Sequence, residues 1–265
     1  MGLADHLTYA RQGLVGVLTP QANTTVEPEF AMLLPPNIGC IAARLVSTRA
    51  ALEDRLTEYF ERLDKTLDTF GSAPLDVVAV ACTGPSYLIG PAAEDRLVSS
   101  LSQRRGVAVS TAAQALVAAL QALGARRLAL VSPYPEALTQ ASIGYWAARG
   151  FEVAAVQPVA AAGGGHHSIY AIGSDAVSEA LQALATEWAS TDERGLDAVL
   201  LLGTGLPTLQ ALARVPATLK PLPVLSSNLA LVWHAMEHLA GRHGSPSAHT
   251  LRALMADDGW RQRLM

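Results

Sequence analysis

A ten-residue pattern occurs twice in this chain, each time where an apolar strand runs into a threonine–glycine turn. Residues 75–84 (LDVVAVACTG) align without gaps to residues 196–205 (LDAVLLLGTG). Two shorter pairs repeat in the same order, and they are 17–20 with 130–133 and 109–111 with 225–227. Any two strand–loop–helix units share some likeness, but the common order favours a duplicated unit, with halves near residues 14–123 and 126–240.

Eight short apolar runs alternate with helical patterns along both halves. They cover residues 14–18, 40–46, 76–81, 107–110, 128–132, 151–156, 197–202 and 223–227. Strands that are apolar along their whole length are typical of parallel sheets with helices on both faces. Residues 51–70 predict one such helix, because Leu52, Leu56, Tyr59, Phe60, Leu63 and Leu67 form an apolar stripe opposite charged residues.

These patterns predict an α/β fold of two pseudo-symmetric lobes, each a four-stranded parallel sheet flanked by helices. We expect an N-terminal lobe over residues 1–123 and a C-terminal lobe over residues 124–265, joined in one compact unit. The active site is expected in the cleft between the lobes, since ligands of open parallel sheets bind beyond the carboxyl ends of the strands.

The composition of the chain argues against several classes of binding partner. A net charge of −4 argues against a nucleic-acid partner, because a phosphate footprint needs a basic stripe. Two cysteines cannot build a disulfide framework or a four-cysteine zinc site, and reduced thiols are typical of the cytoplasm. The uncharged run 153–174 contains Pro158 and three glycines, so it predicts no membrane span. We therefore expect a cytoplasmic protein without nucleic-acid or membrane partners. The sequence does not decide between a monomer and a homo-oligomer.

The repeated turns are the best candidates for a site. Backbone N–H groups where a strand turns into a helix favour an anion, and glycine allows close approach of a ligand. The expected donors are Thr83, Gly84, Thr204 and Gly205. Cys82 stands first in its turn, where such N–H groups lower a thiol's pKa, so it is the candidate nucleophile or proton carrier. The alternative is a small buried hydrophobe, the interpretation that suits Cys40 inside its apolar strand.

Four segments resemble one group of enzymes. They are 16–29 (GVLTPQANTTVEPE), 81–84 (ACTG), 203–209 (GTGLPTL) and 223–241. These segments are similar to the motifs of maleate cis–trans isomerases and arylmalonate decarboxylases, which belong to the aspartate/glutamate racemase superfamily. The superfamily's two pseudo-symmetric lobes agree with the internal repeat.

The resemblance implies a role for each matching residue. Cys82 matches the nucleophilic first cysteine of the isomerases, and Asn23 and Tyr134 match residues that hold a substrate carboxylate. The family's second cysteine falls at Gly203 and is absent here, whereas arylmalonate decarboxylases have glycine at the first position and cysteine at the second. A single thiol argues against two-base racemisation, and a Gly203→Cys variant is expected to restore the pair and to gain weak racemase activity on a 2-aryl or 2-amino acid.

Other signals predict neither a metal nor a cofactor. Residues 234–238 spell the zinc-peptidase pattern H-x-x-E-H, but the segment reads as a packing helix. The Gly203–Gly205 turn lacks the acidic residue of a dinucleotide site, and neither lysine is placed for a pyridoxal Schiff base. For the loop Gly163–Ser168 two interpretations are equal: His167 or Ser168 reaches the ligand, or the loop is simply solvated.

Three functions remain. The leading hypothesis is a cofactor-independent isomerase of a maleate-like small dicarboxylate, with Cys82 as nucleophile and an enolate-like intermediate. The second is a malonate-type decarboxylase in which Cys82 donates a proton. The third is a non-catalytic carboxylate-binding protein, which the missing second cysteine motivates.

Overall fold

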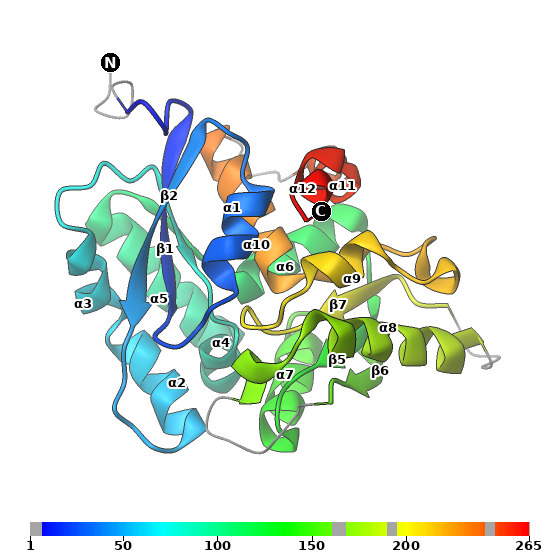
Figure 1. The fold of residues 1–265 in the computed structure, drawn as a ribbon. Helices are drawn as coiled ribbons and strands as arrows, with labels where there is room; N and C mark the ends of the chain where they lie inside the picture. Colours follow the sequence, from blue (N-terminus) through cyan, green and yellow to red (C-terminus); the bar gives the residue numbers. More distant parts are fainter. Residues whose placement is uncertain (1–6, 161–167, 190–194, 242–246, 265) are drawn as a thin grey trace.

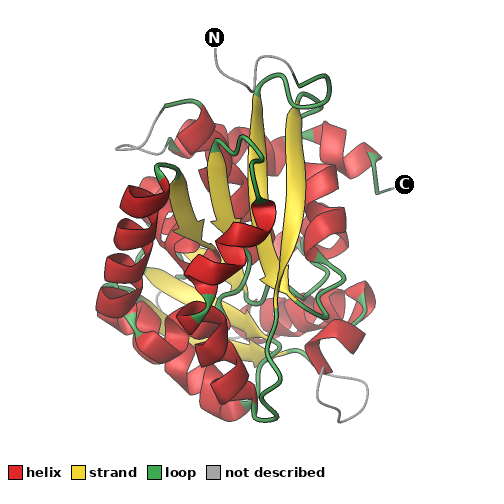
Figure 2. Cartoon of the chain, turned by 90° about the vertical axis from the view of Figure 1, so that its left-hand side faces the viewer, coloured by secondary structure: helices red, strands yellow, loops and turns green. Residues whose placement is uncertain are grey.

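The computed structural model describes residues 7–160, 168–189, 195–241 and 247–264, and its strands form two parallel sheets (Figure 1). The first sheet has the order β2-β1-β3-β4, and its strands are β1 (Gly13–Pro20), β2 (Ile38–Leu45), β3 (Val77–Val80) and β4 (Ala108–Thr111). The second has the order β6-β5-β7-β8, and its strands are β5 (Arg127–Ser132), β6 (Glu152–Pro158), β7 (Ala198–Leu201) and β8 (Val224–Ser226). The equal strand order confirms the predicted fold class, and helices surround the strands of both sheets (Figure 2).

Strand register gives the residue equivalence between the two sheets. Val80 pairs with Leu18 and Thr111, and Leu201 pairs with Val131 and Ser226. The first two matches of the repeat agree with this register. The third was wrong by one residue, because Thr111 corresponds to Ser226 rather than to 227. Both of these residues end a strand and cap the next helix, and their side chains accept from Gln114 N and Leu229 N.

Helices connect the strands and cover the sheets. They are α1 (Val26–Leu33), α2 (Leu52–Glu61), α3 (Leu63–Leu67), α4 (Gly84–Ile89), α5 (Pro91–Arg105), α6 (Ala112–Leu123), α7 (Glu136–Ala148), α8 (Ser174–Ala189), α9 (Leu209–Ala213), α10 (Ser227–Leu239), α11 (Ala248–Ala256) and α12 (Asp258–Gln262). Within the described residues there are also short 3₁₀ segments, which are η2 (Asp68–Phe70), η3 (Ser168–Ala171) and η4 (Ala217–Leu219). Helix α10 follows the last strand of the second sheet but packs against α6 and β3 of the first half. The lobe boundary expected after residue 123 stays a prediction.

The helix predicted over residues 51–70 is divided. It ends as α2 at Glu61 and resumes as α3 at Leu63, because Arg62 leaves helical geometry with φ −99° and ψ 4°. The predicted apolar stripe does pack inward, and Leu56, Tyr59, Phe60, Leu63 and Leu67 are buried. Arg55 is also buried, although the sequence pattern placed it among the charged residues of the outer face.

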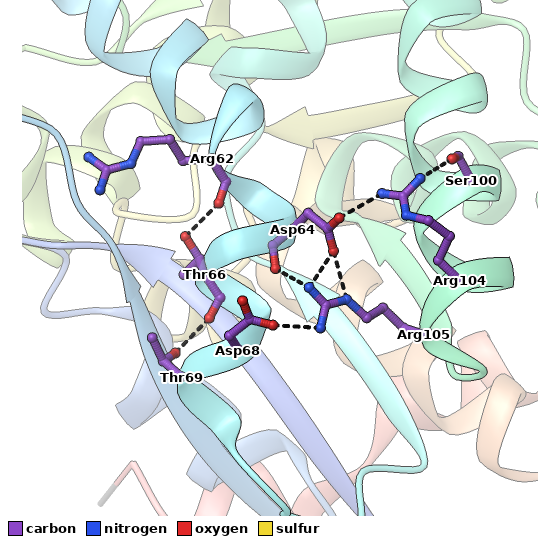
Figure 3. A network of polar contacts seen from close by, with 8 residues as sticks. All are labelled: Arg62, Asp64, Thr66, Asp68, Thr69, Ser100, Arg104 and Arg105. Carbon is purple, nitrogen blue, oxygen red and sulfur yellow. Dashed lines mark hydrogen bonds and ion pairs between the residues drawn. The ribbon is translucent and has the colours of Figure 1, made fainter.

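Two arginines at the end of α5 bind the segment that follows α2. Arg104 pairs with Asp64, and Arg105 pairs with both Asp64 and Asp68 (Figure 3). Exposed ion pairs contribute little singly, but shared and multidentate arginine contacts hold geometry better than isolated pairs. This cluster therefore helps to fix the end of the α2–α3 segment.

Cys40 corrects one expectation. It was interpreted as a buried core residue, yet it is exposed on β2. The physical reason is its place in the sheet, since β2 is an edge strand with β1 as its single neighbour and several of its side chains face outward. Among the described helices, none is long and apolar enough to cross a membrane.

Candidate active site

A cavity of about 330 Å³ lies where the carboxyl ends of β1, β3, β5 and β7 turn into loops. Both repeated turns contribute to its wall, as do α2 and η3. The lining residues are Pro20, Ala22, Ala50, Ala51, Leu52, Arg55, Leu56, Tyr59, Cys82, Thr83, Gly84, Pro133, Tyr134, Pro135, Leu138, Ile169, Tyr170, Gly203, Thr204 and Gly205. The fold thus brings seven of the eight predicted site residues to one cavity.

Cys82 lies two residues beyond β3 and is 5% exposed. Its N–H donates to Val80 O at 3.0 Å, and its sulfur accepts from the Gly84 N–H. Burial raises the pKa of the Cys82 thiol to about 12, because it outweighs the lowering by that N–H. The expectation of a lowered pKa was wrong, because burial has the larger effect. At neutral pH the resting side chain is therefore a thiol that holds its proton.

One hydrogen bond crosses from the first turn to the second sheet. Thr83 Oγ1 lies 2.5 Å from the Tyr134 hydroxyl, which belongs to the loop after β5. Burial raises the pKa of Tyr134, so its phenol stays protonated and can donate a hydrogen bond. This pair places two hydroxyl groups beside Cys82 on the cavity wall.

The second turn supports the first. Thr204 Oγ1 donates to Ala81 O at 2.7 Å, which is the carbonyl just before Cys82. Asn23 Nδ2 approaches the same Thr204 hydroxyl at 3.4 Å. These contacts tie the loop after β7 to the loops after β1 and β3. The Thr204 side chain therefore positions Cys82, while the peptide groups of its turn line the cavity.

Asn23 is the predicted site residue that does not line the cavity. Its Oδ1 accepts from Thr25 N at 2.9 Å and from Val26 N at 3.2 Å, and so caps the start of α1. The side chain is 2% exposed behind the cavity wall. The hydrogen bonds of the Asn23 side chain therefore organise the loop after β1, and its expected role in holding a carboxylate stays a prediction.

Gly203 is the residue of the second repeat that corresponds to Cys82, and its backbone conformation favours glycine. Its φ is +89°, which L side chains rarely adopt. A Cβ there would lie 2.9 Å from Ile169 Cδ1 and 3.1 Å from Pro133 Cγ. The Tyr134 hydroxyl would lie 3.3 Å away, so neighbouring side chains on three sides limit the space for a second thiol.

We accordingly expect Gly203→Cys to be destabilised and to gain no racemase activity by itself. The strained φ and the two contacts must both be relieved before a second thiol can reach the substrate. The combination Gly203→Cys with Ile169→Ala removes the closer contact and should recover part of the lost stability. Thermal unfolding and deuterium exchange at the α-carbon of a bound acid measure the two effects. A single variant with wild-type stability and rapid exchange contradicts this interpretation.

The sequence did not indicate the other lining residues as part of a site, and four of them carry or shape its chemistry. Arg55 and Tyr59 come from α2, and Ile169 and Tyr170 come from η3. Arg55 lies directly before Leu56 of the predicted apolar stripe. A wider inward face of this helix would have included Arg55, and that was the one sign of its position in the sequence. The η3 pair carried no signal, since it follows the loop Gly163–Ser168. Of that loop, residues 163–167 lie outside the described part of the chain, so its expected role stays a prediction.

A buried carboxylate supports the site from behind. Glu29 of α1 accepts from Thr208 N at 2.6 Å, from Leu209 N at 3.2 Å and from Asn228 Nδ2 at 2.7 Å. Burial raises the pKa of Glu29, and these donors oppose the rise. Asn228 Nδ2 also donates to Thr204 O at 3.0 Å. Glu29 thus anchors the second turn through Asn228.

The H-x-x-E-H segment lies within α10 and serves packing. Glu237 accepts from Ser247 N at 2.9 Å and from Thr250 Oγ1 at 2.8 Å, so its carboxylate binds the start of α11. The rings of His234 and His238 meet edge to face at 4.6 Å, and burial lowers the pKa of His234 to about 4. In the described part of the chain, no three His, Cys, Asp or Glu residues gather as metal ligands.

Known proteins share both the sequence pattern and the architecture. A family model described as arylmalonate decarboxylase matches residues 15–251. The maleate isomerase of Geobacillus stearothermophilus is 32% identical over 158 residues, which are 54% of this chain and 62% of that protein. The maleate isomerase of Pseudomonas putida is 30% identical over 150 residues, which are 52% of this chain and 60% of that protein. These matches span less than two thirds of either relative.

Solved structures show the same fold. Maleate cis–trans isomerase of Nocardia farcinica, in a variant with a covalently bound succinylcysteine intermediate, has a TM-score of 0.73 at 23% identity, covering 86% of this chain and 93% of that one. A liganded arylmalonate decarboxylase variant, with one glycine changed to cysteine and one cysteine to serine, has a TM-score of 0.71 at 22% identity. It covers 86% of this chain and 92% of that chain.

Proposed function

Because this chain belongs to the arylmalonate decarboxylase family, we propose that it is a cofactor-independent enzyme that converts a small dicarboxylate through an enolate-like intermediate, with Cys82 as the reacting group. The observation that carries this proposal is the cavity itself. It holds the Cys82 thiol, the Thr83–Tyr134 hydroxyl pair and the turn around Gly203 within one enclosure.

The leading reaction is isomerisation of a maleate-like cis-enedioate. The Cys82 sulfur bonds to one alkene carbon while its proton passes to a carboxylate oxygen of the substrate, and the π electrons move toward that carboxylate. The central bond is then single and can rotate. Return of the electrons expels the sulfur, which regains its proton, and the trans isomer leaves. The thiol needs no prior ionisation in this sequence, which suits its raised pKa.

Two features of the cavity lower the barrier for this step. The protonated Tyr134 hydroxyl can accept from Thr83 and donate its own hydrogen to the oxygen on which negative charge develops. Peptide N–H groups of the two turns add further donors. Each well-placed donor in a water-poor site contributes roughly 3–4 kcal/mol to transition-state stabilisation.

Decarboxylation of a malonate-type acid is the second candidate, and the apolar residues that line the cavity with the Cys82 thiol favour it. Here the bond to one carboxyl group breaks, and its electrons enter the remaining carboxylate as carbon dioxide leaves. Cys82 then delivers its proton to the α-carbon and recovers one from solvent. A largely apolar wall, including Leu52, Leu56 and Leu138, suits the departing neutral molecule.

Proton NMR in deuterium oxide distinguishes the candidates in one experiment. Maleate, malonate and 2-substituted forms of each are incubated with the protein. Conversion of the cis to the trans enedioate without carbon dioxide supports the isomerase, and carbon dioxide loss with deuterium at the α-carbon supports the decarboxylase. Binding without any turnover assigns the third function, a carboxylate-binding protein, and overturns the enzyme proposal.

We expect Tyr134→Phe to reduce kcat/KM by about 10- to 100-fold. It removes one hydroxyl that can donate to a charged oxygen, a bond that contributes roughly 1.5–3 kcal/mol. Tyr9→Phe is the matched control, since that phenol is 89% exposed. Steady-state kinetics on the substrate found by NMR make the measurement, and an unchanged kcat/KM would remove Tyr134 from the site.

A further inference from the structure

Helix α2 places a positive charge in the cavity wall. Leu52, Arg55, Leu56 and Tyr59 follow one another at helical spacing and all line the cavity. Arg55 is 8% exposed, so most of its side chain lies inside the protein. Its Nη1 lies 3.5 Å from Arg49 O, a long contact to a neutral acceptor that helps to orient the guanidinium.

The charge of Arg55 acts on the groups around the thiol. Burial raises the pKa of both Tyr59 and Tyr170, a negative charge on Cys82 would raise them further, and the positive charge of Arg55 opposes the rise at both phenols. The guanidinium, two phenols and the thiol therefore share one electrostatic environment. Charges interact more strongly in a partly enclosed cavity than on the open surface, because less water screens them.

The charged side chains of the cavity wall favour an anionic ligand. Among the described residues that line it, Arg55 is the one charged side chain, and none is Asp or Glu. An anionic ligand would therefore meet one cation and no competing carboxylate on the wall. Arginine suits this role, because its planar fork can bind both oxygens of a carboxylate.

The cavity thus has two places for negative charge. One lies at the turns beside Cys82, where Thr83 and Tyr134 offer hydroxyl groups. The other lies on α2 at Arg55. A ligand with a single carboxylate can use one of them, whereas a dicarboxylate can use both.

We propose that Arg55 binds the distal carboxylate of the substrate, and so selects dicarboxylates whose second carboxylate lies away from the reacting carbon. This inference rests on the proposed function, since it assigns the other carboxylate to the turns beside Cys82. Arg55 is in this sense a specificity-determining residue. The substrate class is a four-carbon or longer dicarboxylate, and a monocarboxylate of equal length binds weakly.

Binding of inert probes tests the subsite without any turnover. Succinate has two carboxylates and butyrate has one on a chain of the same length, and isothermal titration measures the affinity of each. We expect the wild-type protein to bind succinate about 10- to 100-fold more tightly than butyrate, as a charge-assisted bidentate contact would give. Arg55→Met should bring this ratio close to one, because only the turns beside Cys82 then bind a carboxylate.

Two further variants keep the test decisive. Arg49→Met is the matched control, because that side chain is 64% exposed and the substitution leaves its backbone carbonyl in place, so it should keep the wild-type ratio. Arg55→Lys retains charge without the fork and should give an intermediate ratio, and it serves if Arg55→Met does not fold. A wild-type protein that binds the two probes equally, or neither, overturns the proposal, as does an unchanged ratio in both Arg55 variants.

The outcomes separate this subsite from the proposed reaction. If succinate preference depends on Arg55 but neither maleate nor a malonate is turned over, the subsite stands and the reaction falls. If maleate is isomerised while the Arg55 variants keep both the succinate preference and the maleate KM, the reaction stands and the subsite falls.

Discussion

Replacement of Cys82 by alanine is expected to abolish turnover while the fold persists. A positioned proton donor contributes about 10²–10⁴-fold, and a nucleophile that forms the covalent intermediate contributes more. The side chain is small and buried beside a cavity, so its truncation should lower the unfolding temperature by only a few degrees. The measurements are kcat/KM by NMR and thermal unfolding by circular dichroism.

Cys40 provides the control for this experiment. It is the other cysteine of the chain and is exposed on β2, far in sequence from the turns. Cys40→Ala should keep wild-type kinetics, so a loss specific to Cys82→Ala cannot come from thiol removal in general. Retention of more than about a tenth of the activity in Cys82→Ala would contradict a role in either reaction.

The architecture was predictable because it depends on local patterns that repeat. Continuous apolar runs ending in small residues predicted all eight strands to within a few residues, and the duplication predicted two equal sheets. The one-residue shift at Thr111 and Ser226 arose because both turns contain consecutive hydroxyl residues, which align in either register. The pairing of the strands decides between the two alignments, and a local sequence pattern carries no information about that pairing.

The site was predictable only where it follows the strands. Cys82, Thr83 and Gly84 stand where a parallel sheet presents ligands, so position alone indicated them. Arg55 and Ile169 reach the cavity through packing between distant segments, which the sequence does not display. The prediction of a lowered pKa for Cys82 was wrong for the same reason. Burial by neighbouring segments raises this pKa more than the local N–H group of the turn lowers it.

The second large effect is expected at Glu29, whose replacement by leucine should lower the free energy of unfolding by about 3–5 kcal/mol. Leucine has similar size but leaves the donors Thr208 N, Leu209 N and Asn228 Nδ2 without their acceptor. Each buried donor left unsatisfied costs roughly 1–3 kcal/mol. Urea unfolding measures the change.

Two further variants separate the network from the charge. Glu29→Gln keeps one oxygen acceptor, so it should cost roughly half as much as Glu29→Leu. Glu27→Gln removes a 39% exposed carboxylate that pairs with Arg44, and it should change stability by no more than about 1 kcal/mol. A loss below about 1 kcal/mol in Glu29→Leu would mean that water replaces the missing acceptor and that the network is not a support.

The same contacts connect stability to catalysis. Glu29 holds Asn228, Asn228 donates to Thr204 O, and the Thr204 hydroxyl donates to the carbonyl before Cys82. Because each link fixes the next, Glu29→Gln should lower kcat even under conditions where the variant is fully folded. A variant with reduced stability and wild-type kcat would show that Thr204 keeps its place without Asn228, and that the thiol is positioned by its own turn alone.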